Sequence, residues 1–294
     1  MVRKKETVLF VVNPVSGTSE KKHLPDRINK SLDLSRFEPL VLYTSQPGDA
    51  HRIAQEHVQQ GIKKIIAVGG DGTVNEVASA VMNTSSVLGI VPVGSGNGLA
   101  RHLRIPMNIS RAVSLIKFDR IAMVDYGLIN QIPFFCTAGM GFDAHIGNRF
   151  SQLHGRGFAN YVKTTVSEFF SYKPQHYTIR DNGHVIEKEA FLITVANASQ
   201  FGNNAYIAPD ADISDGLLDV TVISPFPKFL SPSFGLKLFN RKLGRSSYVE
   251  MFRTRQLTVE RQSADFVHFD GEPSTMDQKL TFKVKHMGLN VIIP

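Results

Sequence analysis

Residues 64–81, KIIAVGGDGTVNEVASAV, decide the fold of this 294-residue chain. Lys64–Val68 is a short apolar run rich in isoleucine and valine, which predicts a buried strand. The turn Gly69-Gly70-Asp71-Gly72-Thr73 follows, and the spacing of the apolar residues after it predicts a helix with one buried face. Strand, glycine-rich turn and helix in this order are typical of an α/β domain with a parallel sheet.

The turn at residues 69–73 has the chemistry of a phosphate site. The glycines Gly69, Gly70 and Gly72 let the backbone come close to a ligand, and the N–H groups at a helix start attract anions. Because the carboxylate of Asp71 repels phosphate, its predicted role is to hold Mg²⁺ against a nucleotide. The alternative is a plain tight turn. We interpret Thr73 and Glu76 as a capping box of the helix, which explains Glu76 without any ligand.

A second glycine-rich turn, Pro92-Val93-Gly94-Ser95-Gly96-Asn97-Gly98, follows the next predicted strand, Val87–Val91. The carboxyl ends of parallel strands meet at one edge of a sheet, so we expect both turns to face the same ligand. The turn is no dinucleotide fingerprint, because it does not follow the first strand and lacks the later acidic residue. The chain also contains no Walker lysine motif.

A third turn, Asn13-Pro14-Val15-Ser16-Gly17, ends the first predicted strand, Thr7–Val12. Asn13 and Ser16 are expected either to donate to phosphate or to cap the next helix. Further strands are expected at Pro39–Tyr43 and Ile121–Asp125, and a helix from Asp49 to a cap at Gly61. Residues 1–125 are therefore predicted to form an α/β nucleotide-binding domain, a parallel sheet with flanking helices.

From residue 126 onward the pattern changes to strands joined by turns, which predicts a β-rich second domain, a β-sandwich, over residues 126–294. The strands expected there are Ala190–Ala196, Leu217–Ile223, Leu257–Arg261, Phe266–Phe269, Lys279–Lys285 and Asn290–Ile293. One long helix, Phe158–Phe170, interrupts them, and a second is expected after Pro232. The sequence leaves open whether the last strand, Asn290–Ile293, pairs with the second domain or whether the last ~8 residues return to the first domain.

Composition narrows the class of protein. The single cysteine, Cys136, cannot form an internal disulfide, and no Cys/His spacing matches a zinc or iron–sulfur site, which suits a reducing cytosol. The apolar run near the N-terminus covers only Val8–Val12, and no stretch approaches the roughly 18 residues that cross a bilayer. We therefore expect a cytoplasmic protein that meets any lipid from the water side.

The net charge of +7 is concentrated in one stretch, residues 226–255, which holds seven cationic residues and a single acid, Glu250. The cations are Lys228, Lys237, Arg241, Lys242, Arg245, Arg253 and Arg255, interleaved with Phe226, Phe229, Phe234, Leu238 and Phe239. This mixture predicts peripheral contact with an anionic membrane, or else an ordinary amphipathic helix. We do not expect nucleic-acid binding, because no nucleic-acid motif accompanies the patch.

These motifs resemble the diacylglycerol kinase catalytic family, which includes bacterial lipid kinases, sphingosine kinases and ceramide kinases. GGDGT alone is shared with NAD kinases and, nearly, with phosphofructokinases, so it implies a first domain similar to theirs and identifies only the superfamily. The segments at 208–220 and 270–273 point to lipid kinases. The matching pieces are NPVSG at 13–17, Thr44, GGDGTVNEV at 69–77, PVGSGN at 92–97, Val124-Asp125, APDADISDGLLDV at 208–220 and DGEP at 270–273.

The resemblance implies an ATP-dependent kinase that phosphorylates a hydroxyl group of a membrane lipid. Together with the three turns, the resemblance implies that the nucleotide binds against Asn13, Ser16, Gly17, Thr44, Gly69, Gly70, Gly72, Thr73, Asn75, Ser95 and Asn97. It implies a second Mg²⁺ near Asp215, beside the backbone carbonyls of Asp212 and Leu217. It also implies that Glu272 accepts the proton of the lipid hydroxyl, although Asp270-Gly271 makes a plain hairpin residue an alternative.

Two points stay open at this stage. Asp125 is read either as a member of the carboxylate and magnesium network or as a turn cap. Bacterial members usually carry Asp where this chain has Gly98, and sphingosine-kinase-like members are more similar here. Diacylglycerol, a sphingoid base and phosphatidylglycerol therefore all remain candidate substrates. The alternative functions are an NAD kinase and a non-catalytic sensor of a nucleotide or lipid. The sequence does not determine the oligomeric state, and a homodimer is possible.

Overall fold

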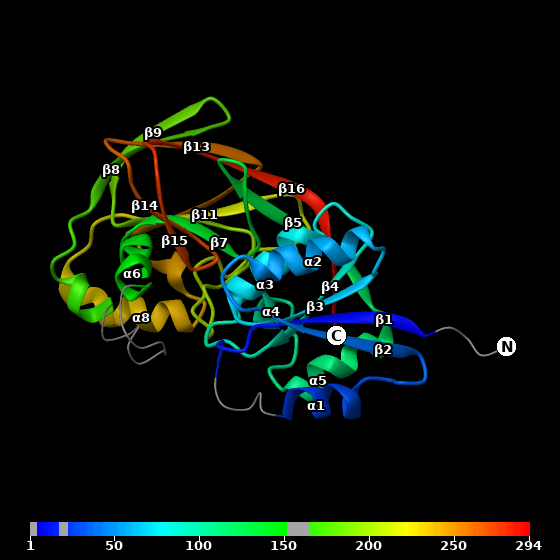
Figure 1. The fold of residues 1–294 in the computed structure, drawn as a ribbon. Coiled ribbons are helices and arrows are strands. Elements are labelled where there is room, and N and C mark those ends of the chain that lie inside the picture. Colours follow the sequence, from blue (N-terminus) through cyan, green and yellow to red (C-terminus); the bar gives the residue numbers. More distant parts are fainter. Residues whose placement is uncertain (1–4, 18–22, 152–164) are drawn as a thin grey trace. The chain divides into compact units, whose positions relative to one another are not determined.

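The computed structural model describes residues 5–17, 23–151 and 165–294 (Figure 1). Internal contacts divide the chain into two units, Met1–Val124 with Met287–Pro294, and Asp125–His286. The last eight residues thus lie in the first unit. The expected fold class is confirmed, with a mostly parallel α/β unit and a β-sandwich-like unit. None of the helices in these ranges is long and apolar enough to span a bilayer.

The first unit is built on four parallel strands in the order β2-β1-β3-β4. Their bounds are β1 Glu6–Val12, β2 Phe37–Tyr43, β3 Lys64–Gly69 and β4 Val87–Pro92. Every residue of β3 and β4 is buried, as expected for strands of a parallel sheet covered on both faces. The end of strand β16 (Lys279–Ile292) lies parallel to β4, where Val291 pairs with Leu88.

The helices of the first unit follow the strands in the alternating order that the sequence predicts. They are α1 Leu24–Ser31, α2 Asp49–Gln59, α3 Asp71–Val81, α4 Gly98–His102, α5 Ile109–Ser114 and the 3₁₀ helix η2 Leu115–Phe118. The predicted start of α2 at Asp49 is confirmed. Gly61 follows its end with a φ of +83°, the left-handed conformation of a helix terminus.

The predicted capping box of α3 is wrong. The helix begins at Asp71, with Gly70 as its N-cap, and not at Thr73. The Glu76 carboxylate reaches another helix instead, accepting hydrogen bonds from the backbone N–H groups of Gly48 (3.0 Å), Ala50 (2.9 Å) and His51 (3.3 Å). Glu76 therefore caps the start of α2, where a carboxylate complements the unpaired N–H groups and the helix dipole.

The second unit contains two sheets. One has the order β12-β11-β10-β7-β14-β15 and is antiparallel throughout. Its strands are β7 Thr137–Gly141, β10 Leu192–Ala196, β11 Leu218–Ile223, β12 Val249–Thr254, β14 Asp265–Phe269 and β15 Glu272–Met276. In the other, the first part of β16 pairs with β13 (Gln256–Arg261), followed by β8 (Gln175–Asp181) and β9 (His184–Ala190).

Three strand predictions need correction. The strand predicted at Ile121–Asp125 is β5 (Ile121–Ile129), which pairs with β16 and not with any of the parallel strands β1–β4. A turn at Asn130 and Gln131, both with positive φ, also folds β5 antiparallel onto β6 (Ile132–Phe134). Lys279–Lys285 and Asn290–Ile293 are parts of the single strand β16, which continues through Met287 at a φ of +49°. Ala190–Ala196 is divided, because β9 ends at Ala190 and β10 begins at Leu192.

Two helices accompany the second unit, α6 (Phe142–Ser151) and α8 (Ser231–Phe239). The helix expected after Pro232 is therefore confirmed, flanked by the 3₁₀ helices η3 Lys228–Leu230 and η4 Leu243–Arg245. Of the predicted helix Phe158–Phe170, residues 158–164 lie outside the described residues, and 165–169 are helical.

Two apolar clusters hold the second unit together. The first lies between the two sheets and joins, among others, Phe134, Met140, Val195, Val259 and Phe282. The second is rich in aromatic residues and packs α6 and α8 against the six-stranded sheet (Figure 1). One face of that sheet therefore meets the other sheet, and the opposite face meets helices.

The first cluster provides a test of packing. Phe134 is fully buried and its ring lies against Gly127, where an added Cβ would stand 2.0 Å from the ring. We expect Phe134→Ala to lower the free energy of unfolding by about 3–5 kcal/mol, because it leaves a cavity. Urea unfolding measures the change. Ile132→Ala, on the same strand but 37% exposed, is the control, and equal losses from both variants would contradict this packing.

Candidate functional site

Three turns meet at the carboxyl ends of β1, β3 and β4 in the first unit. The backbone N–H of Asn13 donates to Val68 O (3.0 Å), and that of Val93 donates to Gly69 O (3.0 Å). The Asn13 side-chain amide also donates to the Thr73 hydroxyl (3.2 Å). The turns at 13–17, 69–73 and 92–98 thus lie together, as their positions after neighbouring parallel strands predict.

Asp71 joins the second and third of these turns. Its two carboxylate oxygens accept the backbone N–H groups of Asn97 (2.8 Å) and Gly98 (2.7 Å). Asn97 has a positive φ of 54°, and its side-chain amide closes the turn by bonding to the backbone N–H and C=O of Gly94. Gly98 therefore contributes a backbone donor to the site.

The glycines of these turns are required by close contacts between backbones. A Cβ added to Gly94 would stand 2.4 Å from the Cα of Gly70. Gly17 has a φ of +72°, and a Cβ there would stand 1.7 Å from the carbonyl oxygen of Val93. No larger residue fits at either place without moving a strand end.

The other predicted nucleotide contacts surround these turns. Thr44 follows β2 and donates its N–H to Val12 O (2.9 Å), beside the end of β1. Ser16 donates its hydroxyl to Asn13 O (3.1 Å), Asn75 lies half-buried in the first part of α3, and Ser95 is exposed at the tip of its turn. Gly70 and Gly72 flank Asp71, and Gly69 is the last residue of β3.

The start of α3 suits a phosphate group bound together with Mg²⁺. The first N–H groups of a helix lack partners within it, and they lie here between the glycine-rich turns. A carboxylate offers about four acceptor positions, so the two hydrogen bonds at Asp71 leave it chemically able to bind a cation as well. Mg²⁺ usually takes one or two carboxylates and completes its shell with phosphate oxygens and water. Asp71 fits that pattern.

In the second unit, Asp125 holds a loop. It is fully buried, and its carboxylate accepts the N–H of Gly216 (2.6 Å) and lies 2.9 Å from Nδ1 of His286. Its own N–H donates to Ile213 O (2.7 Å). Gly216 has a φ of +74°, so the SDG segment depends on glycine at this bend. Asp125 thus positions the loop that carries the other predicted metal ligands.

The predicted second metal site contains a guanidinium group. Asp212 and Asp215 each accept a nearby backbone N–H, from Ser214 (3.0 Å) and Leu217 (3.0 Å). Arg253 lies 3.8 Å from Asp215 and 3.1 Å from Asp219. Burial raises the pKa of Asp219, and the hydrogen bond from Arg253 opposes that shift. The described residues contain no group of three or more His, Cys, Asp or Glu side chains that could hold a metal, so Mg²⁺ here stays a prediction.

Glu272 is exposed at the start of β15, after a two-residue turn. Asp270 and Gly271 both have positive φ (49° and 85°), as the Asp-Gly pair predicts. The buried Asp270 carboxylate accepts the N–H groups of Phe135 (2.8 Å), Cys136 (2.7 Å) and Thr137 (3.1 Å). Glu272 therefore stands on a turn that is fixed to the start of β7.

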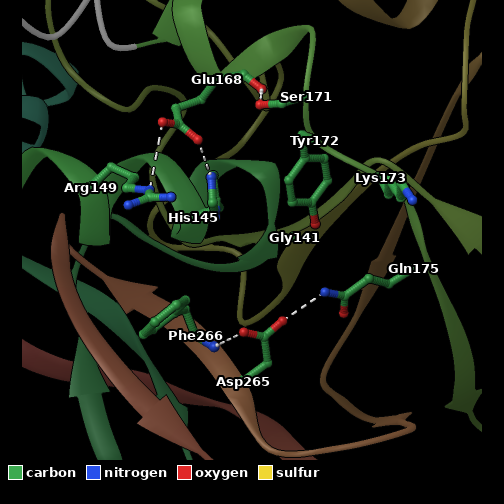
Figure 2. A pocket seen from close by; sticks show the side chains of 10 residues that line it. All are labelled: Gly141, His145, Arg149, Glu168, Ser171, Tyr172, Lys173, Gln175, Asp265 and Phe266. Atoms are coloured by element: carbon green, nitrogen blue, oxygen red, sulfur yellow. Dashed lines mark hydrogen bonds and ion pairs between the residues drawn. The ribbon is translucent and has the colours of Figure 1, made fainter.

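A polar cavity of about 380 Å³ opens in the second unit and was not predicted from the sequence (Figure 2). The Glu168 carboxylate lies 2.8 Å from His145 and 3.6 Å from Arg149. The hydrogen bond with His145 lowers the pKa of Glu168. On the opposite wall, Gln175 donates to Asp265 (2.7 Å). These residues come from α6, the helical residues 165–169, β8 and β14, and no short motif joins them.

A second unpredicted cluster lies between β7, β10 and β14. Asp143 accepts the hydroxyl of Thr194 (2.8 Å) and lies 3.1 Å from Nε2 of His268. The Asp143 and His268 side chains are only 8% and 6% exposed. Gly139 makes room for them, since a Cβ there would stand 2.4 Å from the Asp143 carboxylate. Residues so far apart in sequence carry no local signal of this contact.

Comparison with known proteins yields two family models that together cover most of the chain. The model described as the diacylglycerol kinase catalytic domain matches residues 7–129. The model described as the YegS C-terminal NAD kinase beta sandwich-like domain matches residues 136–293.

Curated relatives agree with these models. A protein of Pseudomonas aeruginosa named "Probable lipid kinase YegS-like" is 31% identical over 87% of this chain and 85% of its own length. A protein of Bacillus subtilis named "Diacylglycerol kinase" is 30% identical over 73% of this chain and 72% of its own length. A crystal structure of a diacylglycerol kinase from Bacillus anthracis has a TM-score of 0.74 at 24% identity, covers 99% of this chain and 98% of its own, and shows the same fold.

The contact at Asp71 can be tested without any ligand. Asp71→Asn places an NH₂ group against one of the two N–H donors, so we expect the free energy of unfolding to fall by about 1–3 kcal/mol. Urea unfolding in the absence of nucleotide measures the change. Asp26→Asn, which removes the same charge from a side chain 71% exposed, is the control. An unchanged midpoint in Asp71→Asn would contradict the bridging role.

Proposed function

We propose that this chain, which belongs to the diacylglycerol kinase catalytic domain family of lipid kinases, uses ATP and Mg²⁺ to phosphorylate the free hydroxyl group of diacylglycerol. The chain is a phosphotransferase that acts on a hydroxyl group, with ATP as the phosphoryl donor. Diacylglycerol as the acceptor, the metal and the role of each residue are our proposal.

The observation that carries the proposal is the contact of the three turns around Asp71. It brings the start of α3 beside the turn that leads into α4, whose Asn97 and Gly98 N–H groups donate to Asp71, so that the first N–H groups of α3 lie between the glycine-rich turns. A triphosphate carries several negative charges, and such N–H groups stabilise it without a Walker lysine. Asn13, Thr44 and Ser95 lie at the rim of this place and bind the rest of the nucleotide.

Bound Mg²⁺ would neutralise charge on the β- and γ-phosphate oxygens. The protein's own contribution is to hold Asp71 in place. Because both oxygens of Asp71 accept backbone N–H groups, the carboxylate has a fixed orientation. Phosphoryl transfer has a loose transition state, so fixed positions and fixed charges contribute most of the catalysis.

Glu272 accepts the proton of the lipid hydroxyl in this proposal. Its exposure leaves the carboxylate accessible, and the Asp270 hydrogen bonds keep its turn rigid. In a loose transition state the attacking hydroxyl loses its proton late, so the base contributes modestly.

Diacylglycerol is supported by the name of the Bacillus subtilis relative. We assign the polar cavity of the second unit to the polar part of the lipid, because it offers Arg149 and His145 to ester or hydroxyl oxygens. Phosphatidylglycerol and sphingoid bases share such groups, and they belong in the same assay. NAD is included because the sandwich family takes its name from NAD kinases.

The assay follows phosphate transfer from labelled ATP to four acceptors, diacylglycerol, phosphatidylglycerol, sphingosine and NAD. The lipids are dispersed in detergent, NAD is added in solution, and the products are identified by mass. We expect phosphorylated diacylglycerol as the main product. Glu272→Gln should lower kcat by no more than about 100-fold with little change in KM for ATP. Glu187→Gln, on an exposed position of β9, is the control. Formation of NADP, or of no phosphorylated lipid, would refute the proposal.

A further inference from the structure

Large apolar side chains project into solvent along one side of η3 and α8. Phe229 is 80% exposed, Leu236 66% and Phe239 46%. Leu236 and Phe239 are three residues apart on α8, so they lie on the same face of that helix, and Phe229 lies just before it, in η3. We call Phe229, Leu236 and Phe239, with the cations Lys228, Lys237, Arg241, Lys242 and Arg245, the α8 surface.

The opposite side of α8 packs against the second unit and holds the helix in place. Phe234 is buried and stacks on Phe226, with ring centroids 4.0 Å apart, and Leu230 and Leu238 pack into the same aromatic cluster. The helix is therefore held by an apolar inner face while a second apolar face points outward. An ordinary surface helix has polar residues there. The amphipathic alternative raised by the sequence accounts for Phe234 and Leu238 but not for Phe229 and Leu236.

A neighbouring segment extends the exposed apolar area. Val166 and Phe170 are 55% and 60% exposed. Lys228 joins the two segments, because its ammonium group donates to the Phe170 carbonyl and lies 6.0 Å from the Phe170 ring centre. Figure 1 shows α8 beside this segment. Glu168, from the same short helix, lines the polar cavity of Figure 2, so the exposed area adjoins that cavity.

The charged residues of the segment that carries α8 have one sign. Residues 224–249 include the five cations and no Asp or Glu. Arg253, which the sequence grouped with them, pairs with Asp219 and does not belong to the surface. The Arg241 guanidinium stacks 4.0 Å from the Tyr206 ring centre, which fixes one cation beside the end of the helix.

We propose that the α8 surface is where the protein docks on an anionic lipid bilayer. Aromatic and aliphatic side chains partition into the headgroup boundary, and lysine and arginine side chains bind lipid phosphates beside them. A uniformly cationic rim around exposed phenylalanine fits a phosphate-rich surface better than a second copy of this chain, whose α8 surface carries the same charge. The inference rests on the proposed function, because the lipid acceptor of that reaction lies in a bilayer.

The test is sedimentation of the full chain with vesicles of phosphatidylcholine alone or mixed with phosphatidylglycerol. We expect binding to the mixed vesicles that weakens with salt. Phe229→Ser with Leu236→Ser should weaken binding at least tenfold, because two inserted apolar side chains are lost. Lys242→Gln with Arg245→Gln should weaken it about 25-fold, roughly fivefold for each cation.

Matched controls come from exposed positions elsewhere in the second unit. Val185→Ser on β9, where the side chain is 52% exposed, controls for loss of an apolar group, and Lys283→Gln with Lys285→Gln on β16 controls for loss of two cations. Both should bind vesicles like the unmodified chain. Unchanged far-ultraviolet circular dichroism of the α8 variants shows that they are folded.

Activity separates this inference from the proposed function. The α8 variants should lose activity on diacylglycerol in vesicles and keep it on a short-chain, water-soluble diacylglycerol. If no lipid is phosphorylated at all, sedimentation still decides the docking surface. Equal binding by the α8 variants and the unmodified chain, or no preference for anionic vesicles, would overturn it. A dimer in solution that Phe229→Ser dissociates would also overturn it, in favour of a second copy.

Discussion

The two hydrogen bonds from Asn97 and Gly98 to the Asp71 carboxylate are the interaction on which the site depends. Hydrogen bonds to an ionised acceptor are stronger than neutral ones, and these two join turns that follow different strands. With Gly70 packed against Gly94, the ends of β3 and β4 have a single arrangement. The acid assigned to the metal is thus also the group that holds the phosphate turns together, so that loss of Asp71 affects structure and chemistry at once.

The second unit uses the same device twice. Asp270 accepts three backbone N–H groups at the start of β7, and Asp125 accepts one from Gly216 while its neighbour His286 lies against the other oxygen. In each case a carboxylate replaces a missing backbone partner and fixes a loop. Glu272 is different, because it is exposed and stands next to one of these anchors. A rigid turn with one accessible carboxylate is what a proton acceptor requires.

Local patterns predicted the elements whose signal lies within a few neighbouring residues. The buried strand at Lys64–Val68 and the turn after it follow from hydrophobic runs and glycines. Glu76 shows where such reasoning fails, because its spacing from Thr73 matches a capping box while its partners are in α2. The sequence pattern predicted two strands where the structure has the single strand β16. Pairing with other strands on both sides of Met287 keeps that strand extended. The polar cavity combines residues from four separate elements, and only tertiary structure brings His145 to Glu168.

The central claim is that the turns around Asp71 bind the triphosphate of ATP, and hydrogen exchange read by mass spectrometry tests it most directly. The account predicts that ATP with Mg²⁺ slows amide exchange in residues 69–75 and 94–98, while exchange in the second-unit hairpin β8–β9 stays unchanged. Asp71→Asn should abolish the protection in both segments together. Binding of ATP with no slowing at these residues, or slowing in only one of the two turns, would contradict it.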